Sequence, residues 1–366
     1  MPRTTGINPP VRAAVLASPE YPFTPVDAPI KLDQNESSLD LPDALRAKVL
    51  EHLHALTWNR YPDLNGEALS AAIGAHDGWP AAGTVAVTGS NVLIALLVQL
   101  AGMGARVLTV KPNFALYALD AKLWGAELVE VPLGPDFVTD VDALIAQIEA
   151  GREALAGRAG PAGVIFVPRQ HAPTGSLCAL SDIERLAQAS QGWLLVVDEA
   201  YHQFAGPSAM EIARRHEHVV LLRTFSKAWG LAGARLGYAL TSEAVARQLR
   251  KLVAPFAVSV FQSVCAQVVL AHPQFMHERV AATIAERERV FKALQAHPTW
   301  KVLPSAANFL LIRTPDAAQA YASLLSGGVL VRKQDSYFGL QGCIRVTIGT
   351  REENDAFLRA AGLSAA

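Results

Sequence analysis

The chain has 366 residues with 51% hydrophobic content, which suits a large core and about two domains. Its formal net charge of -1 gives no electrostatic reason to expect nucleic acid or an anionic membrane as a partner. The three cysteines show neither metal-ligand spacing nor disulfide density, so we expect no metal and a reducing compartment. Because no apolar run reaches the length of a signal core or a membrane span, we expect a soluble, cytoplasmic protein.

Short apolar runs alternate with longer helical segments over the first two thirds of the chain. Seven runs are predicted to be strands, at residues 84–88, 107–110, 128–131, 164–167, 194–197, 219–222 and 238–240. Segments between them, such as 91–100, 115–124 and 181–189, are compatible with helices. This alternation predicts an α/β fold with a mainly parallel sheet covered by helices on both faces.

The pattern changes after about residue 245, where long helical stretches begin. Strands are predicted at 308–313 and 344–348, with the turn at Gly327 and Gly328 between them. We therefore expect three parts. Residues 1–50 form an N-terminal arm and part of a small domain, 51–245 a large ligand-binding domain, and 246–366 a small C-terminal α/β domain.

The run RTFSKAWGLAGARLGY at residues 223–238 combines an amine with phosphate-binding groups. Thr224 and Ser226 supply hydroxyls just before Lys227, and Arg235 supplies a guanidinium eight residues after it. A lysine amine that can lose its proton forms a Schiff base with an aldehyde, so an aldehyde-bearing phosphate ester suits this cluster. Pyridoxal 5'-phosphate (PLP) is the candidate. Taken alone, the run would favour a surface Ser-Lys pair at a helix start, since most lysines are solvated charges.

An apolar run at 194–197 ends directly on Asp198, and Tyr201 follows three residues later. An acid in this position lies at the carboxyl edge of a parallel sheet, where ligands bind in open α/β folds. Asp198 could hold the pyridine nitrogen of PLP protonated, and Tyr201 could donate to the phenolic oxygen. A helix N-cap would explain Asp198 alone. Its position about thirty residues before Lys227 favours the catalytic interpretation.

Together these motifs resemble the fold-type I PLP-dependent aminotransferases, most closely the histidinol-phosphate aminotransferase family. The resemblance covers nearly the whole chain, in the segments KLDQNE (31–36), RYPD (60–63), VVDEAY (196–201), 223–238, ANFLLIR (307–313), GVLVR (328–332) and CIRVTIGT (343–350). It implies amino transfer from histidinol phosphate to 2-oxoglutarate, giving imidazole acetol phosphate and glutamate in histidine biosynthesis. It also implies a seven-stranded sheet in which one strand is antiparallel.

The resemblance assigns further residues to the cofactor. Ser90 and Asn91, at a glycine turn that opens a helix, would bind the PLP phosphate. Phe114 would stack on the pyridine ring, where the family usually has tyrosine. Tyr61 would reach the cofactor of a second subunit, which implies a homodimer. An ordinary glycine turn and a core phenylalanine are the alternatives for the first two sites.

Two arginines near the C-terminus are the candidates for substrate binding. Arg332 and Arg345 are expected on neighbouring strands and resemble the family's clamps for the α-carboxylate of glutamate and the phosphate of the amino-alcohol phosphate. Structural salt bridges are the alternative for each. Tyr21 and Asn308 are further candidates to line this pocket.

The chain departs from the family pattern at residues 169–175, where it reads RQHAPTG and the family reads NPNNPTG. Ala172 replaces an asparagine that donates to the phenolic oxygen of PLP, and His171 or a water is the candidate substitute. An aromatic amino acid aminotransferase or a threonine-phosphate decarboxylase would use nearly the same residues. A PLP-binding regulatory protein without catalysis is the alternative from another class.

Overall fold

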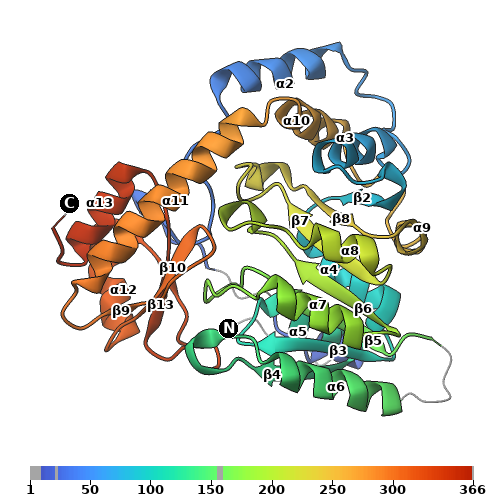
Figure 1. The fold of residues 1–366 in the computed structure, drawn as a ribbon. Coiled ribbons are helices and arrows are strands. Elements are labelled where there is room, and N and C mark those ends of the chain that lie inside the picture. Colours follow the sequence, from blue (N-terminus) through green and yellow to red (C-terminus); the bar gives the residue numbers. More distant parts are fainter. Residues whose placement is uncertain (1–9, 21–23, 155–159, 365–366) are drawn as a thin grey trace.

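The computed structural model describes residues 10–20, 24–154 and 160–364 (Figure 1). Its main sheet has seven strands in the order β2-β8-β7-β6-β5-β3-β4. They are β2 (Thr84–Val87), β3 (Arg106–Lys111), β4 (Glu127–Pro132), β5 (Gly163–Pro168), β6 (Trp193–Asp198), β7 (Val219–Thr224) and β8 (Gly237–Leu240). β8 alone runs in the direction opposite to the other six strands. The mainly parallel sheet with one antiparallel strand is therefore confirmed.

The central strands bury side chains on both faces, which explains their unbroken apolar sequences. In β6, Leu194 and Val196 join one core cluster, whereas Leu195 and Val197 join the other. Helices that cover the first face are α4 (Ser90–Leu97), α5 (Ala115–Leu123) and α9 (Glu243–Arg250). Helices that cover the second are α6 (Val141–Ala154), α7 (Leu180–Ala189) and α8 (Met210–Arg215). All three predicted helices are present, and α4 continues as a π-helix at Val98–Gly102.

A smaller antiparallel sheet is formed by the C-terminal part of the chain, with strand order β12-β13-β10-β9. Its strands are β9 (Lys301–Val302), β10 (Phe309–Arg313), β12 (Arg332–Lys333) and β13 (Cys343–Thr347). The N-terminal segment joins this part, because β1 (Ile30–Lys31) pairs with β11 (Val329–Leu330). The helices α11 (Gln274–Gln295), α12 (Ala317–Ser326) and α13 (Arg351–Ala360) pack on the same core.

A cluster of three helices lies beside the large sheet, and one long helix, α11, follows it toward the small sheet. The helices α2 (Asp43–Ala55), α3 (Glu67–Asp77) and α10 (Val260–Leu270) pack together beside the large sheet (Figure 1). The helix α9 spans residue 245, near which the small domain was expected to begin, and α10 follows it. The apolar periodicity of a helix shows that one face is buried but not which partner buries it. The helix α11 contacts α13 and β9 of the C-terminal part, and the domain boundary expected near residue 245 stays a prediction.

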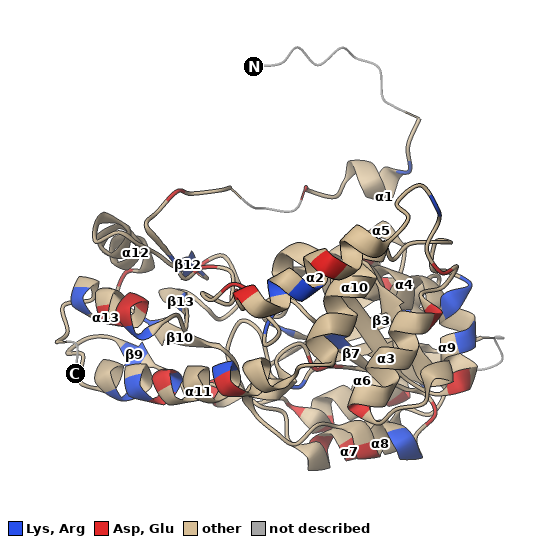
Figure 2. Ribbon diagram, turned by 90° about the horizontal axis from the view of Figure 1, so that it is seen from above, with Lys and Arg blue, Asp and Glu red and all other residues tan. Residues whose placement is uncertain are grey.

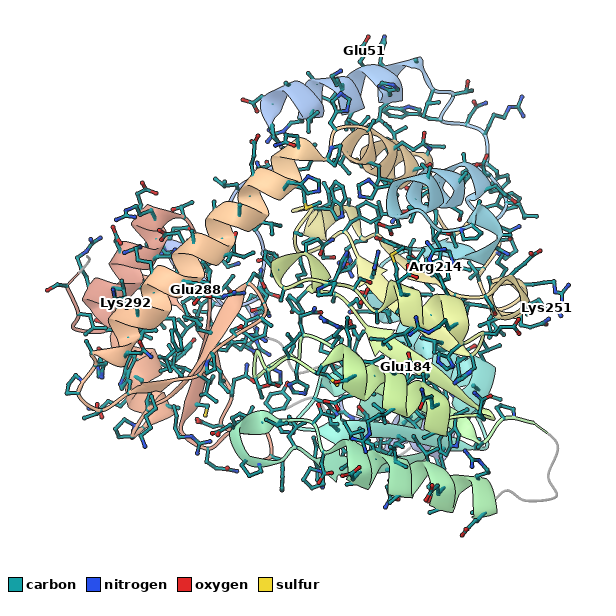
Figure 3. All side chains as sticks on the ribbon, in the orientation of Figure 1. Glu51, Glu184, Arg214, Lys251, Glu288 and Lys292 are labelled. Carbon is teal, nitrogen blue, oxygen red and sulfur yellow. The ribbon has the colours of Figure 1, made fainter. Side chains whose placement is uncertain are left out.

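Charged residues of both signs are spread over the outer helices, including α7, α9, α11 and α13 (Figure 2). On α7, Glu184 accepts a hydrogen bond from Arg215 at 2.6 Å and contacts the ring of His216 at 2.9 Å (Figure 3). The contacts with His216 and Arg215 lower the pKa of Glu184 to about 2. Within the described ranges, no helix has the length and apolar character needed to cross a membrane.

Candidate active site

A cavity of about 340 Å³ lies where the carboxyl ends of the large sheet meet the small sheet. Asp198 and Thr224 are the last residues of β6 and β7, so the parallel register brings both to this edge. The predicted residues that line the cavity are Ser90, Asn91, Phe114, Asp198, Tyr201, Thr224, Ser226, Lys227, Arg235, Arg332 and Arg345. Segments far apart in the sequence therefore converge on one site.

Lys227 projects into the cavity just after β7. Its Nζ donates a hydrogen bond to the main-chain oxygen of Gln34 at 3.0 Å. Burial is the largest influence on its pKa, followed by the positive charge of Arg345, and together they lower the pKa to about 8 despite the opposing charge of Glu36. An appreciable fraction of this amine is therefore neutral close to neutral pH, as a nucleophilic lysine requires.

Asp198 is held by two hydrogen bonds. The hydroxyl of Tyr117 donates to its Oδ2 at 2.7 Å, and the main-chain nitrogen of Ala200 donates to its Oδ1 at 2.9 Å. Burial raises the pKa of Asp198, and these two bonds oppose the rise. Tyr117 was not predicted as a site residue. Its signal was available, because it lies one helical turn after Phe114 and therefore on the same side of α5.

The cavity extends to the start of α4, where Ser90, Asn91 and Arg235 line a recess. An added Cβ at Gly89, whose φ is +92°, would lie 2.9 Å from Nη2 of Arg235, and one at Gly237 would lie 2.2 Å from the main-chain nitrogen of Ser90. The two glycines thus let the guanidinium and the helix N-terminus approach each other. Such an arrangement of cation and helix amides is typical of phosphate binding.

Two hydroxyls extend this recess from the end of β7. Thr224 donates from Oγ1 to Oγ of Ser226 at 3.0 Å, and the main-chain nitrogen of Ser226 donates to Thr224 Oγ1 at 3.1 Å. The cavity therefore offers a phosphate cradle, the aromatic face of Phe114, the Asp198 carboxylate and the amine of Lys227. These are the groups that bind a phosphorylated pyridine aldehyde, so the residues present fit PLP.

Arg332 and Arg345 are direct cross-strand partners on β12 and β13, as expected for neighbouring strands. Nη2 of Arg345 donates to the main-chain oxygen of Asp33 at 2.7 Å, and its Nε is buried without a hydrogen-bond partner among the described residues. Burial lowers the pKa of Arg345. Like charges opposite each other are destabilising, so an anionic ligand between these guanidinium groups would stabilise the pair.

Asn308 has a different position from the one predicted. It is buried beneath the cavity, where its Nδ2 donates to the main-chain oxygen of Asn35 at 3.1 Å. Asn35, with φ of 55°, donates from its Nδ2 to the hydroxyl of Tyr201 at 2.9 Å and from its main-chain nitrogen to Thr347 at 2.9 Å. Asn308 is therefore held against Asn35, which lies next to Tyr201, and it is not among the residues that line the cavity; its part in substrate binding stays a prediction.

His171 does not take over from the missing asparagine. It is buried, with Nδ1 2.7 Å from the hydroxyl of Thr174 and Nε2 2.9 Å from the main-chain oxygen of Pro112. Burial lowers its pKa to about 4. Both ring nitrogens are engaged away from the cavity, whose wall contains Ala172 and Gln170 instead.

Tyr61 is not among the residues that line the cavity. The side chain of Tyr61 is on the outer surface with 82% exposure, and its ring stacks on Phe256 at a centroid distance of 4.7 Å. Tyr21 lies outside the described residues. Across those residues, no group of three or more His, Cys, Asp and Glu side chains is arranged to hold a metal ion.

Residues 27–360 match the family model of class I and II aminotransferases. The chain therefore belongs to the class I and II aminotransferase family. It is 48% identical over 352 residues to a histidinol-phosphate aminotransferase of Deinococcus radiodurans, covering 96% of this chain and 95% of the relative. It is 39% identical over 350 residues to that of Thermococcus kodakarensis, covering 96% and 97%. The resemblance inferred from the motifs is confirmed.

Solved structures agree on the fold. A histidinol-phosphate aminotransferase from Sinorhizobium meliloti in complex with pyridoxal-5'-phosphate superposes with a TM-score of 0.84 and 23% identity, covering 97% of both chains. The enzyme of the same name from Clostridium acetobutylicum gives a TM-score of 0.82 and 22% identity, covering 91% of this chain and 98% of that one. The fold-type I architecture predicted for the chain is therefore confirmed.

Proposed function

We propose that this enzyme, with PLP as its cofactor, transfers the amino group of histidinol phosphate to 2-oxoglutarate, forming imidazole acetol phosphate and glutamate in histidine biosynthesis. The observation that carries the proposal is the position of an opposed arginine pair and a lysine with a pKa of about 8 in one cavity. The names of the sequence relatives support the same substrate. Both substrates are anionic at the end that an arginine fork would bind.

When bound, PLP supplies an aldehyde for amines and a ring that accepts electrons from the bond to be broken. Lys227 holds its amine at the aldehyde and moves the proton at the α-carbon of the substrate, acting as base when neutral and as acid when protonated. Asp198 holds a proton on the ring nitrogen. Tyr201 donates to the phenolic oxygen, and Phe114 covers one face of the ring.

The remaining site residues bind anionic groups. Those assigned to the cofactor phosphate are Ser90, Asn91, Thr224, Ser226 and Arg235. Arg345 and Arg332 hold the substrate carboxylate and phosphate. Tyr21 stays a prediction as a further lining residue.

We also propose that the active unit is a homodimer in which Tyr61 reaches the cofactor of the partner subunit. An exposed aromatic patch supports a partner at this surface: Trp58 is 64% exposed and packs against Phe261, and Tyr61 stacks on Phe256. A cytoplasmic location is supported by three free cysteines.

The test is a single-turnover assay with purified, PLP-loaded protein. The absorbance of the bound cofactor is followed while histidinol phosphate, glutamate, phenylalanine and threonine phosphate are added in separate samples. We expect conversion with histidinol phosphate and with glutamate. Conversion by phenylalanine in place of histidinol phosphate would indicate an aromatic aminotransferase, and carbon dioxide release from threonine phosphate would indicate a decarboxylase. A spectrum that no amine changes would indicate a regulatory protein.

A further inference from the structure

Gln334 follows β12 and lines the cavity, yet it belongs to no motif noted in the sequence. Its side chain is 2% exposed, and its Oε1 has no hydrogen-bond partner among the described residues. Both polar groups of its main chain are hydrogen-bonded. The nitrogen donates to the main-chain oxygen of Cys343 at 2.9 Å, and the oxygen accepts from the main-chain nitrogen of Tyr337 at 3.0 Å. The residue is therefore held in place while its side-chain acceptor stays unpaired.

The pattern of the strand places Gln334 on the substrate side of the cavity. Residues two apart on an extended strand share a face, so Gln334 lies on the same face as Arg332. Arg345 is the direct cross-strand partner of Arg332 and lines the same cavity. Lys333, which lies between Arg332 and Gln334 in the sequence, is exposed. Its Nζ lies 5.1 Å from the centre of the Tyr321 ring on α12. A neutral acceptor thus stands beside the two cations.

A buried carbonyl oxygen without a donor is destabilising, and a donor on a bound ligand is one way in which a native site satisfies such an oxygen. Asp33 and Gln170 also bring unpaired buried oxygens to this cavity. The unpaired oxygen of Asp33 belongs to a carboxyl group on the N-terminal segment, and Gln170 is anchored through Nε2 to the oxygen of Ala205 at 3.1 Å, on the large-sheet side. Gln334 is the unpaired acceptor that directly follows β12, the strand that carries Arg332.

We infer that Gln334 is a specificity-determining residue, whose side-chain oxygen accepts a hydrogen bond from the ring N–H of the substrate while the arginine pair holds the substrate phosphate. The inference rests on the proposed function. The reaction uses one cavity for two amines, and only histidinol phosphate has a ring N–H to donate. Glutamate binds the same arginines without this donor. Gln334 therefore favours one half-reaction and is neutral in the other.

The experiment measures both half-reactions of the PLP-loaded enzyme in wild type and Gln334→Leu, which replaces the amide by an apolar group of similar size. Single-turnover kcat/KM is obtained for histidinol phosphate, for glutamate, and for phenylalaninol phosphate, whose ring has no N–H. The matched control is Lys333→Gln, on the opposite face of the same strand. Gln334→Met is measured in parallel, so that a folding defect specific to the leucine variant does not decide the result.

In Gln334→Leu we expect kcat/KM for histidinol phosphate to fall by roughly tenfold to a hundredfold, because its ring donor is left unpaired in the site. The glutamate value should stay within about twofold of wild type, since no such bond is lost. The preference for histidinol phosphate over phenylalaninol phosphate should largely disappear. An equal fall in kcat/KM for histidinol phosphate and glutamate overturns the inference while leaving the proposed function intact. So does an unchanged kcat/KM for histidinol phosphate in both Gln334→Leu and Gln334→Met. A wild type that converts glutamate but not histidinol phosphate overturns both.

Discussion

Replacing Tyr117 by phenylalanine tests whether its hydroxyl keeps Asp198 ionised. The substitution removes the 2.7 Å hydrogen bond to Oδ2 and preserves the ring, which stacks on Phe166 at 4.8 Å. A hydrogen bond to a charged group contributes about 1.5–3 kcal/mol. Because this bond lowers the pKa of Asp198, we expect its loss to raise that pKa further.

The sign of the pH dependence follows from burial. The pKa of Asp198 is raised above its ordinary value of 3.8, so the folded protein holds this proton more tightly than the unfolded chain does. Its contribution favours folding at low pH and is lost as the pH rises through the raised value. Tyr117→Phe enlarges this loss of folding stability at high pH, because the ionised Asp198 no longer has the hydrogen bond from Tyr117. Its destabilisation relative to wild type should therefore grow with pH, by about 1 kcal/mol or more at high pH.

The assay is denaturant unfolding of the PLP-free protein at several values between about pH 4 and pH 9. Tyr321→Phe on α12 is the control, because that ring lies outside the cavity and contacts Lys333. A destabilisation by Tyr117→Phe that is the same at every pH would refute the argument, since it would show that the hydroxyl does not act through the charge of Asp198.

Three other experiments test the site. In PLP-free protein, Lys227 should react with an amine-directed acylating reagent along a titration centred at a pH of about 8, and labelling that instead rises near the ordinary lysine pKa of 10.5 would contradict its burial. Gly237→Ala should weaken PLP binding by about tenfold or more, because its Cβ would lie 2.2 Å from the nitrogen of Ser90; unchanged affinity by equilibrium titration would remove α4 from the phosphate site. Arg345→Lys should lower kcat/KM for both amines by roughly tenfold or more, with PLP affinity retained, and equal rates would make the arginine structural.

The residues that could be placed from sequence are those whose position follows from strand ends. An apolar run that stops at Asp198 locates the carboxylate at the edge of a parallel sheet, and β6 ends at this residue. Tyr117 and Asn35 could not be placed in this way. Their bonds to Asp198 and Tyr201 join residues 81 and 166 positions apart, and such contacts depend on how helices and loops pack around the sheet.

His171 is a residue that the sequence suggested for the site and that the structure places away from the cavity. Its polar character and its position beside Ala172 suggested a role toward the cofactor. Gln170 and Ala172 on either side of His171 line the cavity, and the turn that begins at Ala172 directs the His171 ring inward. There it meets the Thr174 hydroxyl and the Pro112 oxygen, which satisfy both ring nitrogens. Sequence alone gives the order of the residues but not which of two neighbours faces the ligand.

The segment at residues 33–35 couples the two halves of the site. The oxygen of Asp33 accepts from Arg345, the oxygen of Gln34 accepts from Lys227, and the side chain of Asn35 donates to Tyr201. Three consecutive residues thus contact the substrate clamp, the amine and the cofactor tyrosine. The segment begins where β1 pairs with β11 beside the small sheet. The substrate clamp, the amine and the cofactor tyrosine are therefore all held by one segment of the chain, which begins at the small sheet and ends at the large one.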